Sequence, residues 1–76
     1  MTYAQYIQKF VGKTGWLSQN PHGWFEFTLR SRPSAGRTFE VEHTINEIHD
    51  DFVVVASVSF PVFFRSIPLS LIIFQG

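Results

Sequence analysis

The sequence predicts a mostly β protein, in which an N-terminal helix precedes a five-stranded, strongly bent antiparallel sheet that closes into a small barrel. Three observations predict this fold. Apolar residues recur at helical spacing only in residues 3–11. Beyond residue 23 they alternate with polar residues, as in a strand, and residues 52–60 are rich in β-branched side chains. With 76 residues and 45% hydrophobic content, the chain is expected to form one domain, residues 1–76.

The helix is expected to span about ten residues at the start of the chain, with Thr2 as its N-cap and Gly12 at its end. Its apolar positions recur at helical spacing and are Tyr3, Ile7, Phe10 and Val11. The alternative is a helix lying on a membrane surface. Only Lys9 and Lys13 would supply the basic side that such helices need, so we favour packing against the protein core.

The strands follow from alternation of apolar and polar residues. Residues 13–23 are expected to form a loop, with at most a short strand around Trp16. In residues 24–31, Phe25, Phe27 and Leu29 share one face of a half-buried strand. Residues 37–48 continue the alternation until Glu47, where it breaks, which predicts a bend or bulge. The run at 52–60 is expected to be buried on both faces.

The last part of the chain, "VFFRSIPLSLIIF", is expected to form two short strands joined by a tight turn around Ser66 to Pro68. Its apolar edge would aggregate in water unless another subunit covered it. One of Leu71 and Ile73 is expected to face the barrel interior. The two charge substitutions Leu71→Asp and Ile73→Lys should therefore have different kinds of effect on the protein.

A membrane span over residues 52–74 is the rival interpretation, since this stretch has one charged residue, Arg65. An arginine within a membrane costs roughly 2.5 to 3.5 kcal/mol on the insertion scale, and two prolines also oppose a helix. We therefore expect strands here and no membrane partner.

The composition of the chain excludes several classes of function. The chain has no Cys, which excludes thiol catalysis and cysteine zinc sites and fits a reducing compartment, so we expect a cytoplasmic protein. The first residues do not have the pattern of a signal peptide. Six Lys/Arg balance six Asp/Glu, so any nucleic-acid site must be local. Nine Phe in so short a chain favour self-association.

The sequence gives little support for an enzyme, a cofactor or a metal site. His43 and His49 lie about 20 Å apart on a straight strand, which is too far for one metal ion. No catalytic triad, glycine-rich phosphate loop or spaced carboxylate pair is visible. We expect a protein that is not an enzyme and that carries no cofactor.

Two segments resemble signatures of the Sm/LSm/Hfq family, whose domain is an SH3-like small barrel. "HDDFVVVA" is similar to the first signature, and "FFRSIPLSLI" to the second, with Arg65, Leu69 and Ile72 in register. Three positions depart from the pattern. Ser66 stands where the family usually has Gly, Val54 stands where Sm proteins carry the Asn that reads uracil, and His49 replaces the usual apolar residue before the Asp.

The resemblance implies a ring-forming, RNA-binding protein of RNA processing or regulation, whose ligand is single-stranded RNA, with DNA as an alternative. The site residues that it implies are Asp50, Phe52, Arg65 and Ser66. Because Val54 offers no hydrogen bond to a base edge, discrimination among bases should be weak. The resemblance also implies a closed homo-oligomeric ring of roughly five to seven subunits, in which head-to-tail contacts cover the apolar edge.

Physical chemistry supports these positions and leaves alternatives open. The Arg65 guanidinium can contact a phosphate or a base, or it can serve structurally as the partner of Asp50 or Asp51. The Phe52 ring can stack on a base or simply pack in the core. A second candidate phosphate surface is the hairpin loop that carries Arg30, Arg32 and Arg37, although a merely solvated loop is equally consistent with that pattern. The alternative function is a structural ring that acts as a scaffold or protein-binding platform.

Overall fold

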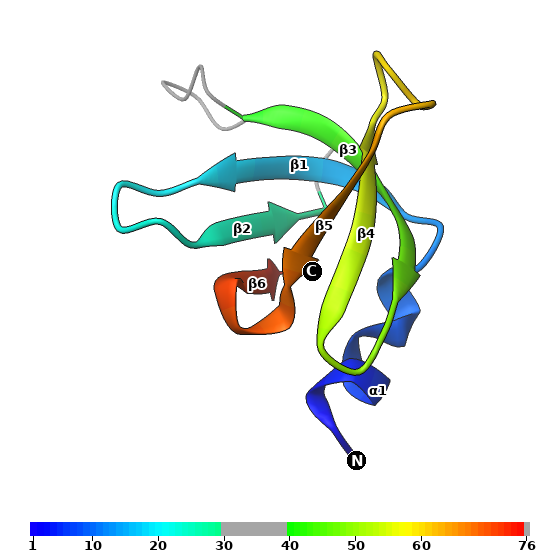
Figure 1. Cartoon of the computed structure of the whole chain (residues 1–76), viewed down its shortest axis with the longest axis vertical. Coiled ribbons are helices and arrows are strands. Elements are labelled where there is room, and N and C mark those ends of the chain that lie inside the picture. Colours follow the sequence, from blue (N-terminus) through cyan, green and yellow to red (C-terminus); the bar gives the residue numbers. More distant parts are fainter. Residues whose placement is uncertain (30–39, 76) are drawn as a thin grey trace.

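The computed structural model describes residues 1–29 and 40–75, which form one short helical segment and a six-stranded mixed sheet (Figure 1). The elements in chain order are α1 (Tyr3–Tyr6), the 3₁₀ helix η1 (Ile7–Phe10), β1 (Thr14–Gln19), β2 (Phe25–Thr28), β3 (Val41–Ile48), β4 (Phe52–Ser57), β5 (Phe64–Pro68), the 3₁₀ helix η2 (Leu69–Leu71) and β6 (Ile72–Gln75). The expected class, mostly β with an N-terminal helix, is confirmed.

The helical segment begins and ends where the sequence predicts. Thr2 is the N-cap and forms a capping box with Gln5, in which each backbone N–H donates to the other residue's side chain, at 2.9 and 3.1 Å. Gly12 has a φ of +82°, a conformation that favours glycine, and its N–H donates to the Ile45 carbonyl at 2.7 Å.

The segment buries Ile7 and Phe10. The expected burial of Tyr3 and Val11 is wrong, because these residues are 45% and 39% exposed.

No helix in residues 1–29 or 40–75 has the length and apolar character needed to cross a membrane. Residues 52–74, considered above as a possible span, instead form β4, β5, η2 and most of β6.

The order of strands in the sheet is β5-β4-β3-β1-β2-β6, and all neighbours are antiparallel except β2 and β6, which are parallel. The expected five-stranded, wholly antiparallel arrangement is therefore wrong in two respects. The segment around Trp16 is a full strand, β1, which lies between β3 and β2. Its core-facing positions include Gly15 and Leu17, and because glycine adds no apolar signal, the alternation is hidden in the sequence.

The end of the chain also differs from expectation. Residues 66–68 belong to β5 rather than to a turn, because Pro68 adopts extended angles (φ −59°, ψ 138°) and β5 lies at the sheet edge, where proline is tolerated. The chain reverses through η2 instead, where the Leu69 N–H donates to the Asp51 carbonyl at 2.9 Å. Leu71 and Ile73 are both 43% exposed, so the expectation that one of them faces the interior is wrong.

β3 and β4 build the centre of the core. The predicted bulge in β3 is confirmed: the register shifts between Ile45 and Glu47, which allows both Ile45 and Ile48 to be buried. β4 is not buried on both faces as expected. Val53 and Val55 are fully buried, whereas Phe52 and Val54, which point to the other face, are half-buried.

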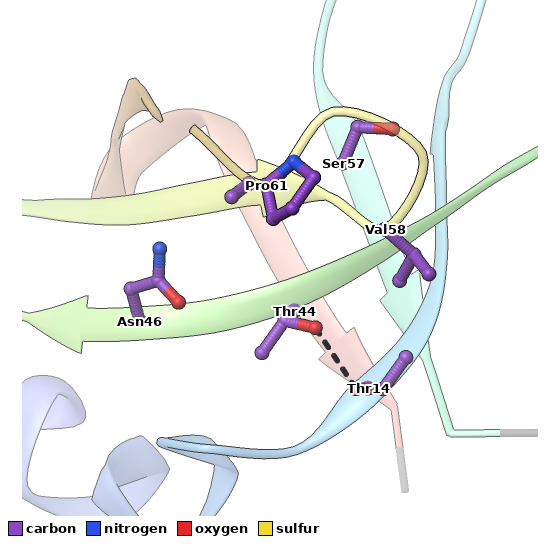
Figure 2. A pocket seen from close by; sticks show the side chains of 7 residues that line it. Thr14, Thr44, Asn46, Ser57, Val58 and Pro61 are labelled. Atoms are coloured by element: carbon purple, nitrogen blue, oxygen red, sulfur yellow. Dashed lines mark hydrogen bonds between the residues drawn. The ribbon is translucent and has the colours of Figure 1, made fainter. Parts of the chain in front are cut away.

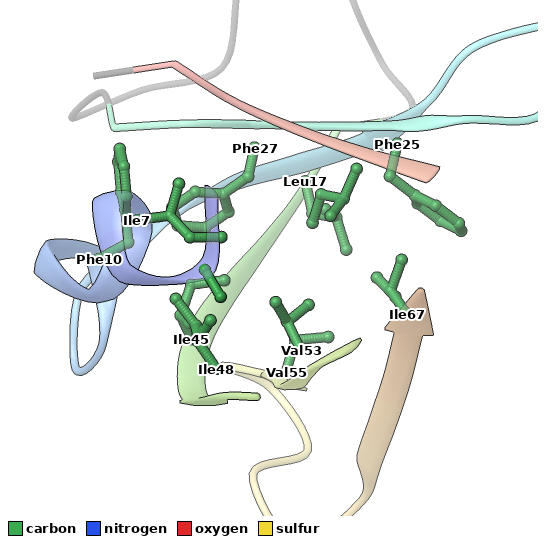
Figure 3. Close-up of a cluster of buried hydrophobic side chains, with 12 residues drawn as sticks. Ile7, Phe10, Leu17, Phe25, Phe27, Ile45, Ile48, Val53, Val55 and Ile67 are labelled. Atoms are coloured by element: carbon green, nitrogen blue, oxygen red, sulfur yellow. The ribbon is translucent and has the colours of Figure 1, made fainter. Parts of the chain in front are cut away.

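The core lies on the concave face of the sheet and is covered at one end by α1 and η1 (Figure 3). Ile67 on β5 and Phe25 on β2 belong to the same cluster, although three strands separate β5 from β2 in the sheet. In a flat sheet these two strands would be roughly 19 Å apart, at about 4.8 Å for each neighbouring pair. The sheet is therefore strongly bent, as predicted, but β5 and β6 remain its two edges and it is open.

Candidate nucleic-acid interface

The register of β4 and β5 determines which predicted site residues share a face. Arg65 pairs with Val55, and both lie on the concave face that carries the core. Phe52 pairs with Pro68, on the opposite, convex face, because side chains alternate along each strand. The two residues that were expected to act together on one ligand are thus on opposite faces of a single subunit.

Arg65 lies within β5, not in a turn, and its side chain is exposed. The guanidinium carbon lies 4.7 Å from the centroid of the Phe25 ring, which is a cation–π contact. Within residues 1–29 and 40–75, the structure gives no ion pair between Arg65 and Asp50 or Asp51, which lie in the β3–β4 turn. The intramolecular partner of Arg65 is therefore an aromatic ring, and not the carboxylate that the structural alternative expected.

A hollow of about 130 Å³ opens beside this arginine, at the end of the concave face that the helical segment does not cover. It is lined by Leu17, Ser18, Gln19, Phe25, Val41, His43 and Arg65. Gln19 and His43 supply hydrogen-bonding groups next to the guanidinium. No motif in the sequence connects these two residues with Arg65. The alternation of residues 37–48 puts His43 on the same face as Val41 and Ile45, whereas the place of Gln19 depends on the pairing of β1.

The acidic turn and Phe52 form a separate group on the convex side. The Phe52 ring stacks on the His49 imidazole, with ring centroids 4.4 Å apart and planes 18° apart. His49 Nε2 lies 3.0 Å from a Glu47 carboxylate oxygen. Phe52 is half-buried and does not belong to the buried core cluster, so core packing does not account for its ring.

Asp50, Asp51 and Ser66 are exposed. Ser66 pairs with Val54, and therefore shares the convex face with Phe52. The structure thus brings Phe52, Ser66 and the acidic turn to one side and leaves Arg65 on the other. Arg30, Arg32 and Arg37 lie outside the described residues.

A larger hollow, of about 320 Å³, lies on the convex face (Figure 2). It is lined by Thr14, Thr44, Asn46, Ala56, Ser57, Val58 and Pro61, and the hydroxyls of Thr14 and Thr44 are hydrogen-bonded at 2.9 Å. None of the described residues that line it has a charged side chain, so these residues offer no cation to a phosphate. Among the described residues, no three His, Asp or Glu side chains are close enough to hold a metal ion.

Comparisons of the chain with protein-family models, with curated proteins and with solved structures found no match. The assignment of a function therefore depends on the chemistry of the two faces.

Proposed function

We propose that this protein binds single-stranded nucleic acid, with RNA as the first ligand to test, through Arg65 and the concave hollow beside it. One observation carries the proposal: an exposed guanidinium lies over the Phe25 ring at the rim of a hollow that also presents His43 and Gln19. An arginine held over a ring can accept a stacked base on its free side, and its N–H groups can bind phosphate bidentately.

The size of the hollow supports a small anionic group as the part of the ligand that enters it. A water molecule occupies about 30 Å³ in the liquid, so 130 Å³ corresponds to only a few waters. That volume suits a phosphate group and is small for a complete nucleotide. Arg65 would then bind the backbone, which fits the expectation of weak discrimination among bases.

The convex group offers a second contact. A base could stack on the Phe52–His49 pair, with a stabilisation of about 1 to 3 kcal/mol per stacked base. Because Arg65 and Phe52 lie on opposite faces, one nucleotide cannot contact both in the same subunit. In a ring of roughly five to seven subunits, as the resemblance to the Sm/LSm/Hfq family implies, each site would be repeated and weak contacts would add along a strand.

Two features favour a ring or another assembly. β5 and β6 are sheet edges, and an unpaired edge is a template for pairing with another chain. Leu71 and Ile73, which lie in η2 and β6, are exposed. The same features support the alternative function, a structural oligomer that binds no nucleic acid.

Arg65→Ala is expected to weaken binding of poly-U or poly-A oligonucleotides at least tenfold, because it removes the guanidinium that, among the described residues, lines the concave hollow. The slope of log affinity against log salt should fall by about one for the phosphate contact that is lost. Fluorescence anisotropy with labelled oligonucleotides measures both quantities. Native mass spectrometry of the parent and the variant shows whether the oligomer is unchanged. Lys13→Ala, which removes a positive charge elsewhere on the surface, is the matched control and should change affinity much less.

Two results would count against this proposal. If the parent binds no oligonucleotide at low salt, nucleic-acid binding is wrong and the structural oligomer becomes the better assignment. If an intact Arg65→Ala oligomer binds as tightly as the parent, the concave hollow is not the site. Phe52→Ala then tests the convex face.

A further inference from the structure

The tip of the β4–β5 hairpin, residues 58–64, carries most of the strongly exposed apolar side chains of the described chain. In Figure 1 this hairpin, drawn in yellow and orange, extends beyond the rest of the sheet at the end opposite the N-terminus. The exposed fractions are 44% for Val58, 62% for Phe60, 75% for Val62, 70% for Phe63 and 65% for Phe64. We call these residues the apolar tip.

The apolar tip is exposed on all its sides. Val62, Phe63 and Phe64 are consecutive, so their side chains cannot all point the same way, yet each is mostly exposed. The rings of Phe60 and Phe63 contact each other, with centroids 6.4 Å apart, but neither ring packs on the core. A partner that covers the tip must therefore surround it, rather than pack against one face.

The tip carries no charged side chain that would have to leave water. The sequence has no Asp, Glu, Lys or Arg between Asp51 and Arg65. Three backbone N–H groups of the hairpin are already paired within the protein: Val58 donates to Glu42, Phe60 to Ser57 and Phe63 to Phe60, at 3.0 to 3.1 Å. Neither a charge nor these donors would need to be stripped of water on insertion into an apolar medium.

The area of the tip argues against a protein as the partner. Specific protein interfaces take about 20 to 30 residues and about 800 Å² from each side. The tip is a single turn of residues 58–64, and the neighbouring convex surface of Thr44 and Asn46 is polar. A bilayer, in contrast, surrounds an inserted group and needs no matching shape.

We propose that the apolar tip inserts into the interfacial region of a lipid bilayer. The distance from Pro61 to Phe64 is at most about 10 Å, the value for a fully extended chain at about 3.3 Å per residue, and this limit lies within the 5–10 Å depth of interfacial apolar groups. Arg65 follows directly and is exposed, so its guanidinium would lie at the level of the headgroup phosphates. From the sequence we expected no membrane partner, because the only membrane contacts that its pattern offered were a surface helix and a complete span.

The charges at the base of the hairpin identify the lipid class. Arg65 lies on one side, and Glu42, which is exposed and bonded through its carbonyl to Val58, lies on the other. Their charges cancel, and the whole chain has a formal net charge of zero. The inserted apolar surface must then provide the binding, and zwitterionic lipid is sufficient.

Flotation with vesicles of phosphatidylcholine alone tests the proposal. The parent should float with the vesicles, and Phe60→Ser combined with Phe63→Ser should lower the partition coefficient about a hundredfold, because each ring contributes at least tenfold. Both rings are exposed, so the double variant should fold. The matched control, Tyr6→Ser with Val11→Ser, removes two exposed apolar side chains elsewhere and should float as the parent does. Arg65 is unchanged in all these proteins, so their nucleic-acid binding should be unaffected.

Three results would overturn the proposal. The parent could fail to float, or the Phe60→Ser and Phe63→Ser variant could float as well as the parent. The parent could also be an oligomer that dissociates specifically in this variant, in which case a second copy of the chain, and not lipid, covers the tip. Analytical ultracentrifugation of the same samples without vesicles detects the third result.

Discussion

Replacing Gly15 with alanine is expected to remove about 3 kcal/mol or more from the free energy of unfolding, at the upper end of the cost of overpacking. A Cβ atom at this position would lie 2.5 Å from the Thr28 carbonyl oxygen and 2.8 Å from Cζ of Phe27. The first atom is backbone of the neighbouring strand β2, and moving it would disturb the pairing of Trp16 with Thr28. For a domain of this size, total stability is roughly 4 to 11 kcal/mol, so the loss is a large share.

Urea denaturation followed by tryptophan fluorescence measures this loss, with parent and variants at equal concentration because self-association would add to apparent stability. Thr14→Ala in the same strand is the control. It removes only an exposed hydroxyl contact with Thr44 and should cost under about 1 kcal/mol. If Gly15→Ala unfolds within about 0.5 kcal/mol of the parent, the close approach of β2 to Gly15 is wrong.

Phe27→Ala is expected to cost about 3 to 5 kcal/mol, the range for removing a buried phenylalanine ring. Phe27 is fully buried, at 0% exposure. Its ring meets that of Phe10 edge to face, with centroids 6.1 Å apart, and lies 5.7 Å from that of Phe74. The side chain therefore joins the helical segment, β2 and β6 in one cluster, and all three lose contacts when it is truncated.

The matched control for this substitution is Phe63→Ala, which is chemically identical but lies in the exposed apolar tip. It should change the unfolding free energy by less than about 0.5 kcal/mol. Thermal unfolding followed by circular dichroism compares the two variants directly. Equal midpoints for Phe27→Ala and the parent would show that the core is not organised around this ring.

The features predicted correctly from sequence depend on local signals. Thr2 and Gly12 mark the ends of the helical segment by capping and by a positive φ. The alternation around Phe25 and Phe27 identifies β2, because each apolar side chain lies two residues from the next. The bulge in β3 was predictable because two apolar positions, Ile45 and Ile48, are out of phase with an unbroken strand.

The features that were missed depend on contacts between distant segments. β1 was expected to be mostly loop because Gly15, which faces the core, contributes no apolar side chain. The parallel pairing of Phe25 with Ile72 requires that the chain turn at η2, and no local turn signal indicates which strand β6 will join. The turn assigned to Ser66–Pro68 followed the usual role of proline, but an edge strand accepts Pro68 as its last residue.

In the candidate site, too, the features with a local signal could be predicted and those that depend on distant contacts could not. The exposure of Arg65 and its position on a strand rich in apolar residues could be anticipated from sequence. Its separation from Phe52 could not, because the two faces are assigned by the register of β4 against β5, where Phe52 pairs with Pro68. Contact with Phe25 depends on the bend of the whole sheet, which brings β5 over β2.

The parallel pair of β2 and β6 has a consequence for folding kinetics. Between Phe25 and Ile72 the chain forms β3, β4 and β5, so a long segment must close before this pair gains any contact. We expect β6 to join the sheet after the transition state, once the β3–β4 and β4–β5 hairpins have formed. Ile72→Val should then accelerate unfolding while leaving the folding rate nearly unchanged, whereas Val53→Ala in β4 should slow folding. Stopped-flow measurements that find slower folding for Ile72→Val would place β6 in the folding nucleus instead.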